Sequence, residues 1–234
     1  MQIHIGTSGY AYKEWKGKFY PTALPAPAMF AYYAERFATT EINSTFYGMP
    51  EAATVTAWAA AAPAGFTFSL KAPQRITHFE RLRNTSNSTR DFIALARRLR
   101  VHAGPILFGL APNMKKDSAR LREFVAALPK GPRFAFEFRH PSWFDDETYA
   151  TLRARNLALC IADTDDLRTP TVATADWGYL RLRRVTYRAP ALAKWLGEVR
   201  AQPWSEAFIY FKHEETATGP KLARRLLDLA AAPT

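Results

Sequence analysis

The chain has 234 residues, of which 48% are hydrophobic and 23% charged, a composition that excludes a disordered or collagen-like protein. A single cysteine, Cys160, excludes an internal disulfide. The net charge of +11 favours anionic partners such as nucleic acid or phosphorylated small molecules, although a solvated basic surface has the same composition.

Eight short apolar runs have the length and composition of strands. Several are apolar almost throughout, as at Leu157-Ala158-Leu159-Cys160-Ile161-Ala162. This pattern is typical of a parallel sheet that is covered on both faces. In chain order the predicted strands are residues 3–7, 40–43, 66–71, 105–110, 133–138, 158–163, 177–182 and 206–211.

Amphipathic segments between these runs predict seven helices. In chain order they are residues 28–37, 51–61, 89–101, 117–128, 145–155, 189–199 and 220–231. The exception follows the sixth strand, where residues 163–174 contain Pro170 and three aspartates and predict a loop. The alternation predicts a (β/α)8 TIM-barrel-like fold with an irregular or missing helix after strand six. The alternative is an open doubly wound sheet, but no phosphate-binding glycine motif supports a nucleotide-binding version of it.

No repeat, low-complexity tract or linker divides the chain, so we expect a single domain over residues 1–234. The first residues lack the basic and apolar regions of a signal peptide. No uninterrupted run of about 18 apolar residues is present to span a membrane. We therefore expect a cytoplasmic protein with no membrane partner, and the sequence does not predict its oligomeric state.

Polar or ionisable residues follow seven of the eight predicted strands. In a barrel these strand ends meet at one mouth, where ligands bind. Buried charges are costly unless they face water or pair with one another, so a salt-bridged rim without function is the alternative. The candidate catalytic residues are Glu41, Glu137, Asp163 and His78. The candidate ligand-binding residues are Thr7, Ser8, Tyr10, Asn43, Lys71, Arg139, His140, Arg181 and Lys212.

These residue types predict a metal-independent, enzyme-like pocket for a small anionic ligand. Arginine and lysine suit a phosphate or carboxylate, and the turn at Gly6-Thr7-Ser8-Gly9 could direct N–H and hydroxyl groups at the same anion. Glu41 or Glu137 is the expected general acid or base, and Asp163 or His78 the residue that orients it.

Other functions stay open. A nucleic-acid-binding protein or nuclease would use the basic stretches at residues 71–100 and 181–188. A glycosidase would use two of the carboxylates, but the basic mouth suits an anion better than a neutral sugar. A Schiff-base enzyme would need burial to lower the pKa of Lys71 or Lys212. A non-catalytic scaffold would lock all these charges in salt bridges.

A metal site would have to be assembled from His78, His140 or His213 together with the acidic residues. No motif of metal-ligand spacing is present. We therefore expect neither a metal nor another cofactor. Cys160 lies inside a predicted strand and is expected to be an unreactive core thiol.

Several strings along the chain resemble one known family. They are Ile5-Gly6-Thr7-Ser8-Gly9-Tyr10, Phe19-Tyr20-Pro21, Glu41-Ile42-Asn43-Ser44-Thr45-Phe46-Tyr47, Lys71-Ala72-Pro73, Ile76-Thr77-His78 and Glu137-Phe138-Arg139-His140-Pro141-Ser142-Trp143. They resemble the YecE-like family, domain of unknown function 72 (DUF72). The resemblance covers nearly the whole chain and implies a TIM-barrel-like fold, but no established activity. An analogy with barrel endonucleases that act on DNA rests on the fold alone.

The chain departs from the commoner pattern of that family at three strand ends. Gly109 stands where many members have glutamine, and Arg183-Arg184 stand where many have His-Gly. After the eighth strand, Lys212-His213-Glu214 replaces an asparagine-rich string. These changes make the predicted mouth more basic.

Overall fold

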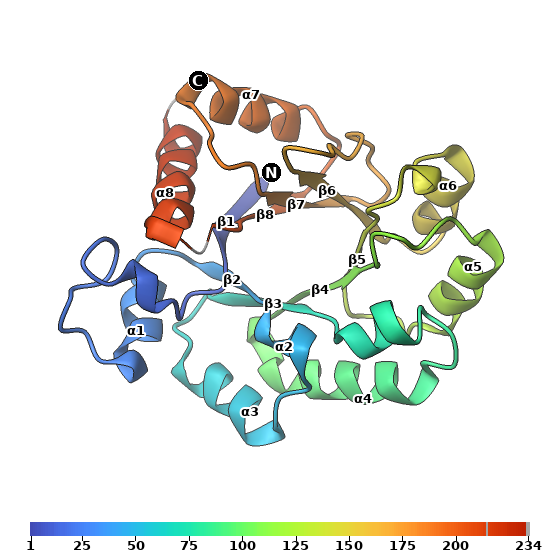
Figure 1. Ribbon diagram of the computed structural model, residues 1–234, viewed down its shortest axis with the longest axis horizontal. Helices are drawn as coiled ribbons and strands as arrows, with labels where there is room; N and C mark the ends of the chain where they lie inside the picture. The colour runs from blue at the N-terminus through green and yellow to red at the C-terminus, as the bar shows by residue number, and fades with distance from the viewer. Residues whose placement is uncertain (214, 233–234) are drawn as a thin grey trace.

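The structure, a computed structural model, describes residues 1–213 and 215–232. Within them eight strands form a closed, all-parallel barrel in chain order (Figure 1). The strands are β1 (Gln2–Ser8), β2 (Thr39–Ile42), β3 (Thr67–Lys71), β4 (Ala103–Gly109), β5 (Phe134–Glu137), β6 (Ala158–Asp163), β7 (Trp177–Leu182) and β8 (Glu206–Phe211). The predicted TIM-barrel-like fold is confirmed, and the open-sheet alternative is wrong because β1 pairs with β8.

Helices surround the ring of strands (Figure 1). They are α1 (Met29–Ala34), α2 (Ser44–Tyr47), α3 (Ala52–Ala61), α4 (Ser86–Ala96), α5 (Ser118–Ala127), α6 (Asp146–Arg153), α7 (Ala189–Arg200) and α8 (Thr218–Ala231). Short 3-10 helices occupy Lys13–Trp15, Ala26–Ala28, Arg97–His102, Pro141–Trp143 and Glu215–Ala217, and a π-helical turn occupies Arg75–Phe79. The sequence did not predict α2. Residues 164–176, all of them described, join β6 to β7 without a helix, as expected from Pro170.

Acidic caps fix the starts of two predicted helices. The Asp117 carboxylate accepts a hydrogen bond from the Arg120 backbone N–H at 3.0 Å. Helix α5 begins at Ser118, directly after Asp117. Asp145 does the same for α6, accepting from the Thr148 N–H at 2.9 Å. Such caps satisfy N–H groups that have no partner within the helix. Within the described residues, no helix is both long enough and apolar enough to cross a bilayer.

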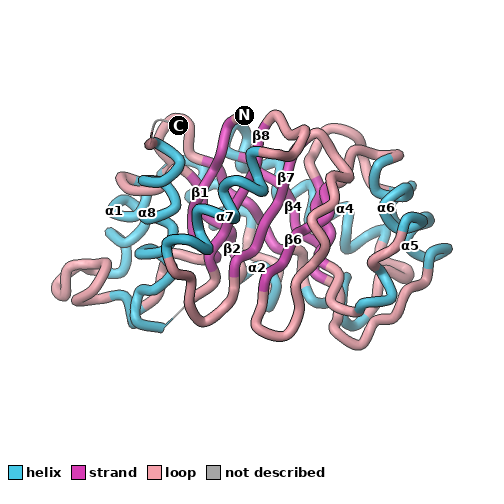
Figure 2. Tube along the Cα trace, turned by 90° about the horizontal axis from the view of Figure 1, so that it is seen from above, coloured by secondary structure: helices cyan, strands magenta, loops and turns pink. Residues whose placement is uncertain are grey.

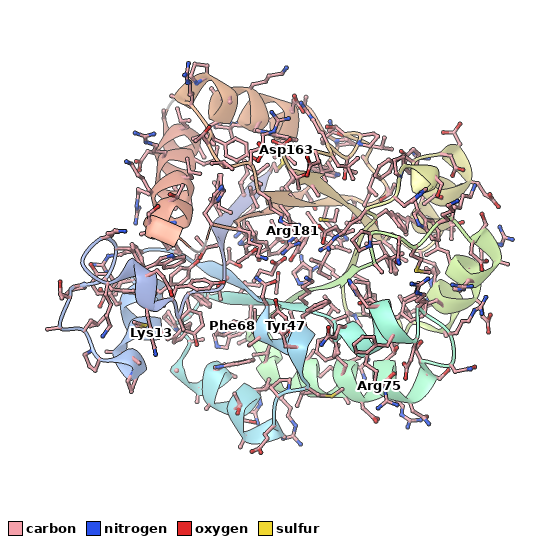
Figure 3. The ribbon with its side chains drawn as sticks, in the orientation of Figure 1. Lys13, Tyr47, Phe68, Arg75, Asp163 and Arg181 are labelled. Atoms are coloured by element: carbon pink, nitrogen blue, oxygen red, sulfur yellow. The ribbon has the colours of Figure 1, made fainter. Side chains whose placement is uncertain are left out.

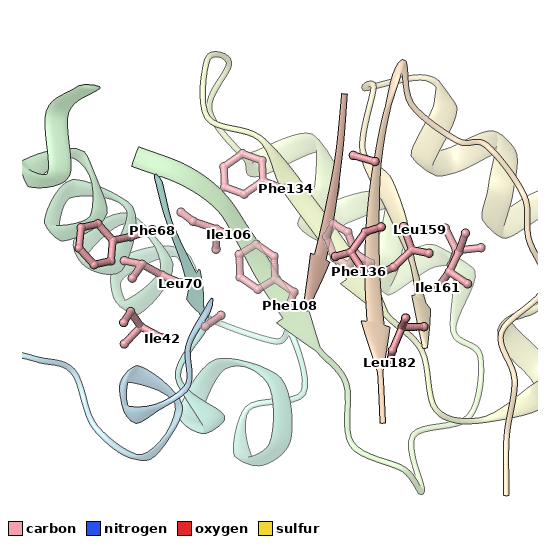
Figure 4. Close-up of a cluster of buried hydrophobic side chains, with 14 of the residues drawn as sticks. Ile42, Phe68, Leu70, Ile106, Phe108, Phe134, Phe136, Leu159, Ile161 and Leu182 are labelled. Atoms are coloured by element: carbon pink, nitrogen blue, oxygen red, sulfur yellow. The ribbon is translucent and has the colours of Figure 1, made fainter. Parts of the chain in front are cut away.

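The strands carry two cores because their side chains alternate between the two faces of the barrel wall. Outward-facing residues such as Phe68, Phe108 and Phe136 pack under the surrounding helices (Figure 4). A second buried cluster inside the barrel includes Tyr179 and Cys160. Burial raises the pKa of the Cys160 thiol well above its usual value, as expected for an unreactive core residue.

The strands begin at one end of the barrel and finish at the other. Seen from the side, the N-terminus lies at one end of the barrel and α2, which follows β2, lies at the other (Figure 2). This second end is the mouth where all eight strands finish, since the sheet is wholly parallel.

Candidate functional site

Four polar side chains from different strands meet inside the barrel near its mouth. The strand register pairs Ser8 of β1 with Glu41 of β2. Glu137 ends β5, and Arg181 of β7 lies at the centre of the ring of strands (Figure 3). Glu41, Glu137 and Arg181 are each at most 1% exposed. Residues that are far apart in the sequence therefore form one buried network.

Glu41 is saturated with hydrogen bonds from three side chains. Its Oε1 accepts from Ser8 Oγ at 2.6 Å and from Arg181 Nη2 at 2.9 Å. Its Oε2 accepts from the Tyr179 hydroxyl at 2.6 Å. Burial alone would raise the pKa of Glu41, but Arg181 and the bonds from Ser8 and Tyr179 hold it below its usual value. Glu41 is therefore ionised at neutral pH.

Glu137 is shared by three arginines. Its Oε2 accepts from Arg181 Nη1 at 2.8 Å and from Arg139 Nη2 at 3.3 Å. Its Oε1 lies 3.5 Å from Arg183 Nη1. Burial opposes ionisation, but these arginines hold the pKa of Glu137 far below its usual value. A carboxylate held ionised in this way is a poor proton carrier near neutral pH. The geometry therefore favours a positioning role for Glu41 and Glu137 over the expected role of general acid or base.

Lys71 lies at the same mouth but is held differently. It ends β3 and is 7% exposed, and its Nζ lies 3.9 Å from the centroid of the Phe46 ring. Within the described part of the chain, Nζ has neither a hydrogen bond nor an ion pair. Burial and the nearby Arg181 lower the pKa of Lys71 to about 7. Its amine is therefore partly unprotonated at neutral pH.

A cavity of about 340 Å³ opens at the mouth beside these groups. Its lining includes Tyr10, Tyr12, Asn43, Phe46, Lys71 and Lys212. Asn43 Nδ2 and the nearby Arg139 Nε are buried and have no hydrogen-bond partner in the described residues. None of the predicted catalytic residues lines the cavity, and neither does Arg181. Of the predicted ligand-binding residues, Tyr10, Asn43, Lys71 and Lys212 line it.

Two predicted site residues lie on the other face of the barrel wall, so the expectation that they share this hollow is wrong. Thr7 hydrogen-bonds with the Tyr33 hydroxyl of α1 at 2.9 Å. Asp163 accepts from Arg184 Nε at 2.8 Å and from the Tyr187 hydroxyl at 2.9 Å, and it lies beyond the strands toward α7 (Figure 3). Side chains alternate between the two faces of a strand. Thr7 and Asp163 therefore face outward, because the adjacent residues Ser8 and Ala162 face inward.

The remaining predicted residues lie at the rim. Tyr10 lines the cavity and packs against Phe30 at a centroid distance of 5.2 Å. His78 packs edge-on against Phe46 at 5.0 Å, and burial together with Arg139 and Lys71 lowers its pKa. His140 does not line the cavity; its Nδ1 accepts from the Ser142 N–H at 3.2 Å and so caps the short helix after β5.

The sequence-based prediction missed three residues of the network. Tyr179 and Arg183 lie two residues before and after Arg181, which is the spacing of side chains on one face of a strand. That spacing could have found them. Phe46 lies on α2, which carried no recognisable helical signal. Arg181 itself is buried, so it cannot belong to an exposed basic track with its neighbours.

The acidic and histidine residues do not assemble a metal site in the described residues. Among them, no group of three His, Cys, Asp or Glu side chains is arranged to hold an ion. The expectation of a metal-independent pocket stays a prediction.

Comparisons with known proteins point to one family. The family described as "Protein of unknown function DUF72" matches residues 4–234. The UPF0759 protein YecE of Escherichia coli K12 is 26% identical over 143 residues, which are 61% of this chain and 50% of that protein. The match therefore spans half the length of this relative.

Two solved structures of DUF72 family proteins share the fold. The protein from Thermotoga maritima superposes with a TM-score of 0.86 at 22% identity, covering 99% of this chain and 100% of that one. The protein from Enterococcus faecalis superposes with a TM-score of 0.82 at 16% identity, covering 100% of this chain and 97% of that one. At these identities the likeness concerns the fold alone.

Proposed function

The chain belongs to the DUF72 family, and from that premise we propose that it binds a small carboxylate- or phosphate-bearing molecule at the C-terminal mouth of its barrel. The family description names no activity, so the proposal depends on the geometry of the mouth. Ligands of TIM barrels bind at this end, where the loops after the strands vary.

The observation that carries the proposal is that three polar groups beside the cavity, all of them donors, lack an acceptor. Lys71 Nζ, Asn43 Nδ2 and Arg139 Nε have no acceptor among the described residues. Buried donors without partners cost about 1–3 kcal/mol each, so a ligand that supplies acceptors gains that energy on binding. Anionic oxygens are the strongest such acceptors.

The excess of positive charge at the mouth also favours an anionic ligand. Arg139, Arg181 and Arg183 pair with Glu137, and Arg181 also pairs with Glu41, so three arginines face two carboxylates at the inner end of the mouth. Arg139 and Arg183 keep 24% and 26% of their side chains exposed, whereas Arg181 keeps 1%. Partly exposed arginine forks suit a carboxylate or a phosphate.

Each network residue then has a distinct role. Glu41 and Glu137 fix Arg181, which supports the floor of the site without reaching the cavity. Asn43, which lines the cavity, and the partly exposed Arg139 and Arg183, which lie outside its lining, hold the anion. This division also disfavours the glycosidase alternative, since both candidate carboxylates are at most 1% exposed and each is paired with Arg181.

Calorimetric titration with oxalate and with inorganic phosphate tests the proposal. We expect one of them to bind the wild-type protein, and Arg183→Gln to weaken that binding about tenfold through the loss of a charge-assisted bond. Arg98→Gln is the matched control, because Arg98 is exposed on the 3-10 helix that precedes β4, at the opposite end of the barrel. Equal affinities in both variants, or no binding by the wild type, would overturn the proposal.

The nucleic-acid alternative is separated by salt. A single-stranded oligonucleotide bound along the basic stretches would lose affinity steeply with salt, and Arg98→Gln would weaken it as much as Arg183→Gln. The scaffold alternative is the outcome in which neither the small anions nor the oligonucleotide binds.

A further inference from the structure

Lys71 differs from the other basic residues of the inner network in that no carboxylate holds its charge. Its side chain faces the inside of the barrel and lines the cavity. Its nearest named contact is aromatic: Nζ lies 3.9 Å from the centroid of the Phe46 ring. An amine in this position is accessible from the cavity while most of its side chain is shielded from water.

The carboxylates that could pair with Lys71 are occupied. Arg181 Nη2 and Nη1 lie 2.9 Å and 2.8 Å from oxygens of Glu41 and Glu137. Burial, with Arg181 and Arg139 nearby, lowers the pKa of Lys71 from its usual 10.5 to about 7. Removal from water and a neighbouring cation are the two means by which proteins make a lysine nucleophilic.

Lys116 shows the opposite arrangement. Its Nζ pairs with Asp145 and lies 2.6 Å from Glu147. The hydrogen bonds that Lys116 donates to these carboxylates raise its pKa above the usual value. Lys116 therefore stays an ammonium ion at neutral pH. The two lysines differ because Lys116 pairs with two carboxylates, whereas Lys71 contacts an aromatic ring.

We propose that Lys71 is a nucleophile that forms an imine with the aldehyde or ketone group of a small carboxylate- or phosphate-bearing molecule. This inference rests on the proposed function, because Arg139 and Arg183 hold the anionic group while the carbonyl carbon meets Nζ. Phe46 and Trp58, which also line the cavity, limit the access of water that would hydrolyse the imine.

The chemistry balances without an oxidant or reductant. The Nζ electron pair attacks the carbonyl carbon, a C–N bond forms, and a proton moves from nitrogen to oxygen to give a carbinolamine. The C–O bond then breaks, the oxygen leaves as water after taking one more proton, and the protonated imine remains. The positive charge of the imine replaces the positive charge of the original ammonium group, so Glu41 and Glu137 keep the same electrostatic surroundings.

Reductive trapping with glyoxylate tests the inference, because this probe carries both an aldehyde and a carboxylate. We incubate the full chain with glyoxylate and cyanoborohydride at pH 7 and map carboxymethyl-lysine by peptide mass spectrometry. We expect Lys71 to be modified at least about tenfold faster than Lys116, since its unprotonated fraction at pH 7 is larger by several orders of magnitude.

The pH profile adds a second readout. The Lys71 adduct should form faster as the pH rises from 5.5 to 8, with a midpoint near the pKa of about 7. The adduct at Lys116 should rise only at higher pH. The charged or titratable groups around the Lys71 amine, which set this profile, are Glu41, His78, Glu137, Arg139, Arg181, Arg183 and Lys212.

Lys71→Arg tests the imine directly. Arginine keeps the charge but cannot form an imine, so the variant should lose the adduct at position 71. Oxalate binding and trapping, measured on the wild-type protein, separate this inference from the proposed function. Lys116→Arg is the control and should leave the Lys71 adduct unchanged. Oxalate binding without preferential trapping at Lys71 overturns the imine and leaves the proposed function standing. Trapping at Lys71 without binding of oxalate or phosphate supports the imine and overturns the proposed function.

Discussion

Two clusters at the carboxyl end of the barrel contain the same kinds of residue on opposite faces of its wall. Inside, Glu41 bonds to Arg181 and to the Tyr179 hydroxyl. Outside, Asp163 bonds to Arg184 and to the Tyr187 hydroxyl. The difference is solvent: the side chain of Arg181 is 1% exposed, whereas that of Arg184 is 44% exposed.

This difference decides what each cluster can do. The inner cluster cannot use water to satisfy a missing bond, so each charge depends on its protein partners. The outer arginine can exchange its carboxylate for water at little cost. The inner cluster is therefore a rigid support beneath the cavity, and the outer cluster joins the strands to α7, with Trp195 Nε1 also donating to Asp163 at 3.3 Å.

The largest expected effect comes from removing the two arginines in turn. Arg181→Met should lower the free energy of unfolding by about 3–5 kcal/mol, because it leaves the buried Glu41 without its salt bridge and removes the shortest salt bridge of Glu137. Arg184→Met should lower it by no more than about 1 kcal/mol, since the Arg184 side chain is 44% exposed and the Tyr187 hydroxyl and Trp195 Nε1 still donate to Asp163. Urea denaturation of both variants measures the two losses. Equal losses would show that burial does not distinguish the clusters.

The second-largest expected effect is a loss of stability in acid, when the carboxylates of the inner cluster become protonated. The pKa values of Glu41 and Glu137 are lowered by folding, so the unfolded chain binds more protons and stability falls as the pH drops below the usual value of about 4.5. We expect a loss of about 2 kcal/mol between pH 5 and pH 3.5, measured by urea midpoints. Arg181→Met should flatten this decline, because the variant loses the cation that does most to offset the effect of burial on both pKa values. An unchanged slope in the variant would contradict the assignment.

The hydroxyl groups allow a finer comparison. Tyr179→Phe should lower the free energy of unfolding by about 1.5–3 kcal/mol, as expected for a buried bond to a charged acceptor. Tyr187→Phe should lower it by about 1 kcal/mol, because Arg184 and Trp195 still satisfy Asp163. Thermal denaturation of the paired variants measures the difference, and a larger loss in Tyr187→Phe would reverse the ranking of the two clusters.

The sequence predicted the barrel well because strand and helix periodicities are local. Runs such as residues 158–163 needed only their own residues to be recognised as a strand. The sequence predicted the site less well. Whether a side chain at a strand end faces the barrel interior or the surrounding helices depends on how that strand pairs with its neighbours. Asp163 and Glu137 each end a strand, yet one faces α7 and the other faces the barrel interior. The low pKa of Lys71 depends on its burial and on Arg181, 110 positions along the chain, and no local pattern reveals either.

The smallest expected effect compares two glycines. A Cβ at Gly109 of β4 would lie 3.0 Å from Glu137 Oε2 and 3.5 Å from Lys71 Cε, whereas a Cβ at Gly197 of α7 would meet nothing within 4 Å. Gly109→Ala should therefore cost about 1 kcal/mol, because Arg181 prevents Glu137 from moving aside. Gly197→Ala should gain up to about 1 kcal/mol through helix propensity. If Gly109→Ala proved neutral in urea denaturation, the Glu137 carboxylate would have room to move. The inner cluster could then no longer be described as a rigid support beneath the cavity.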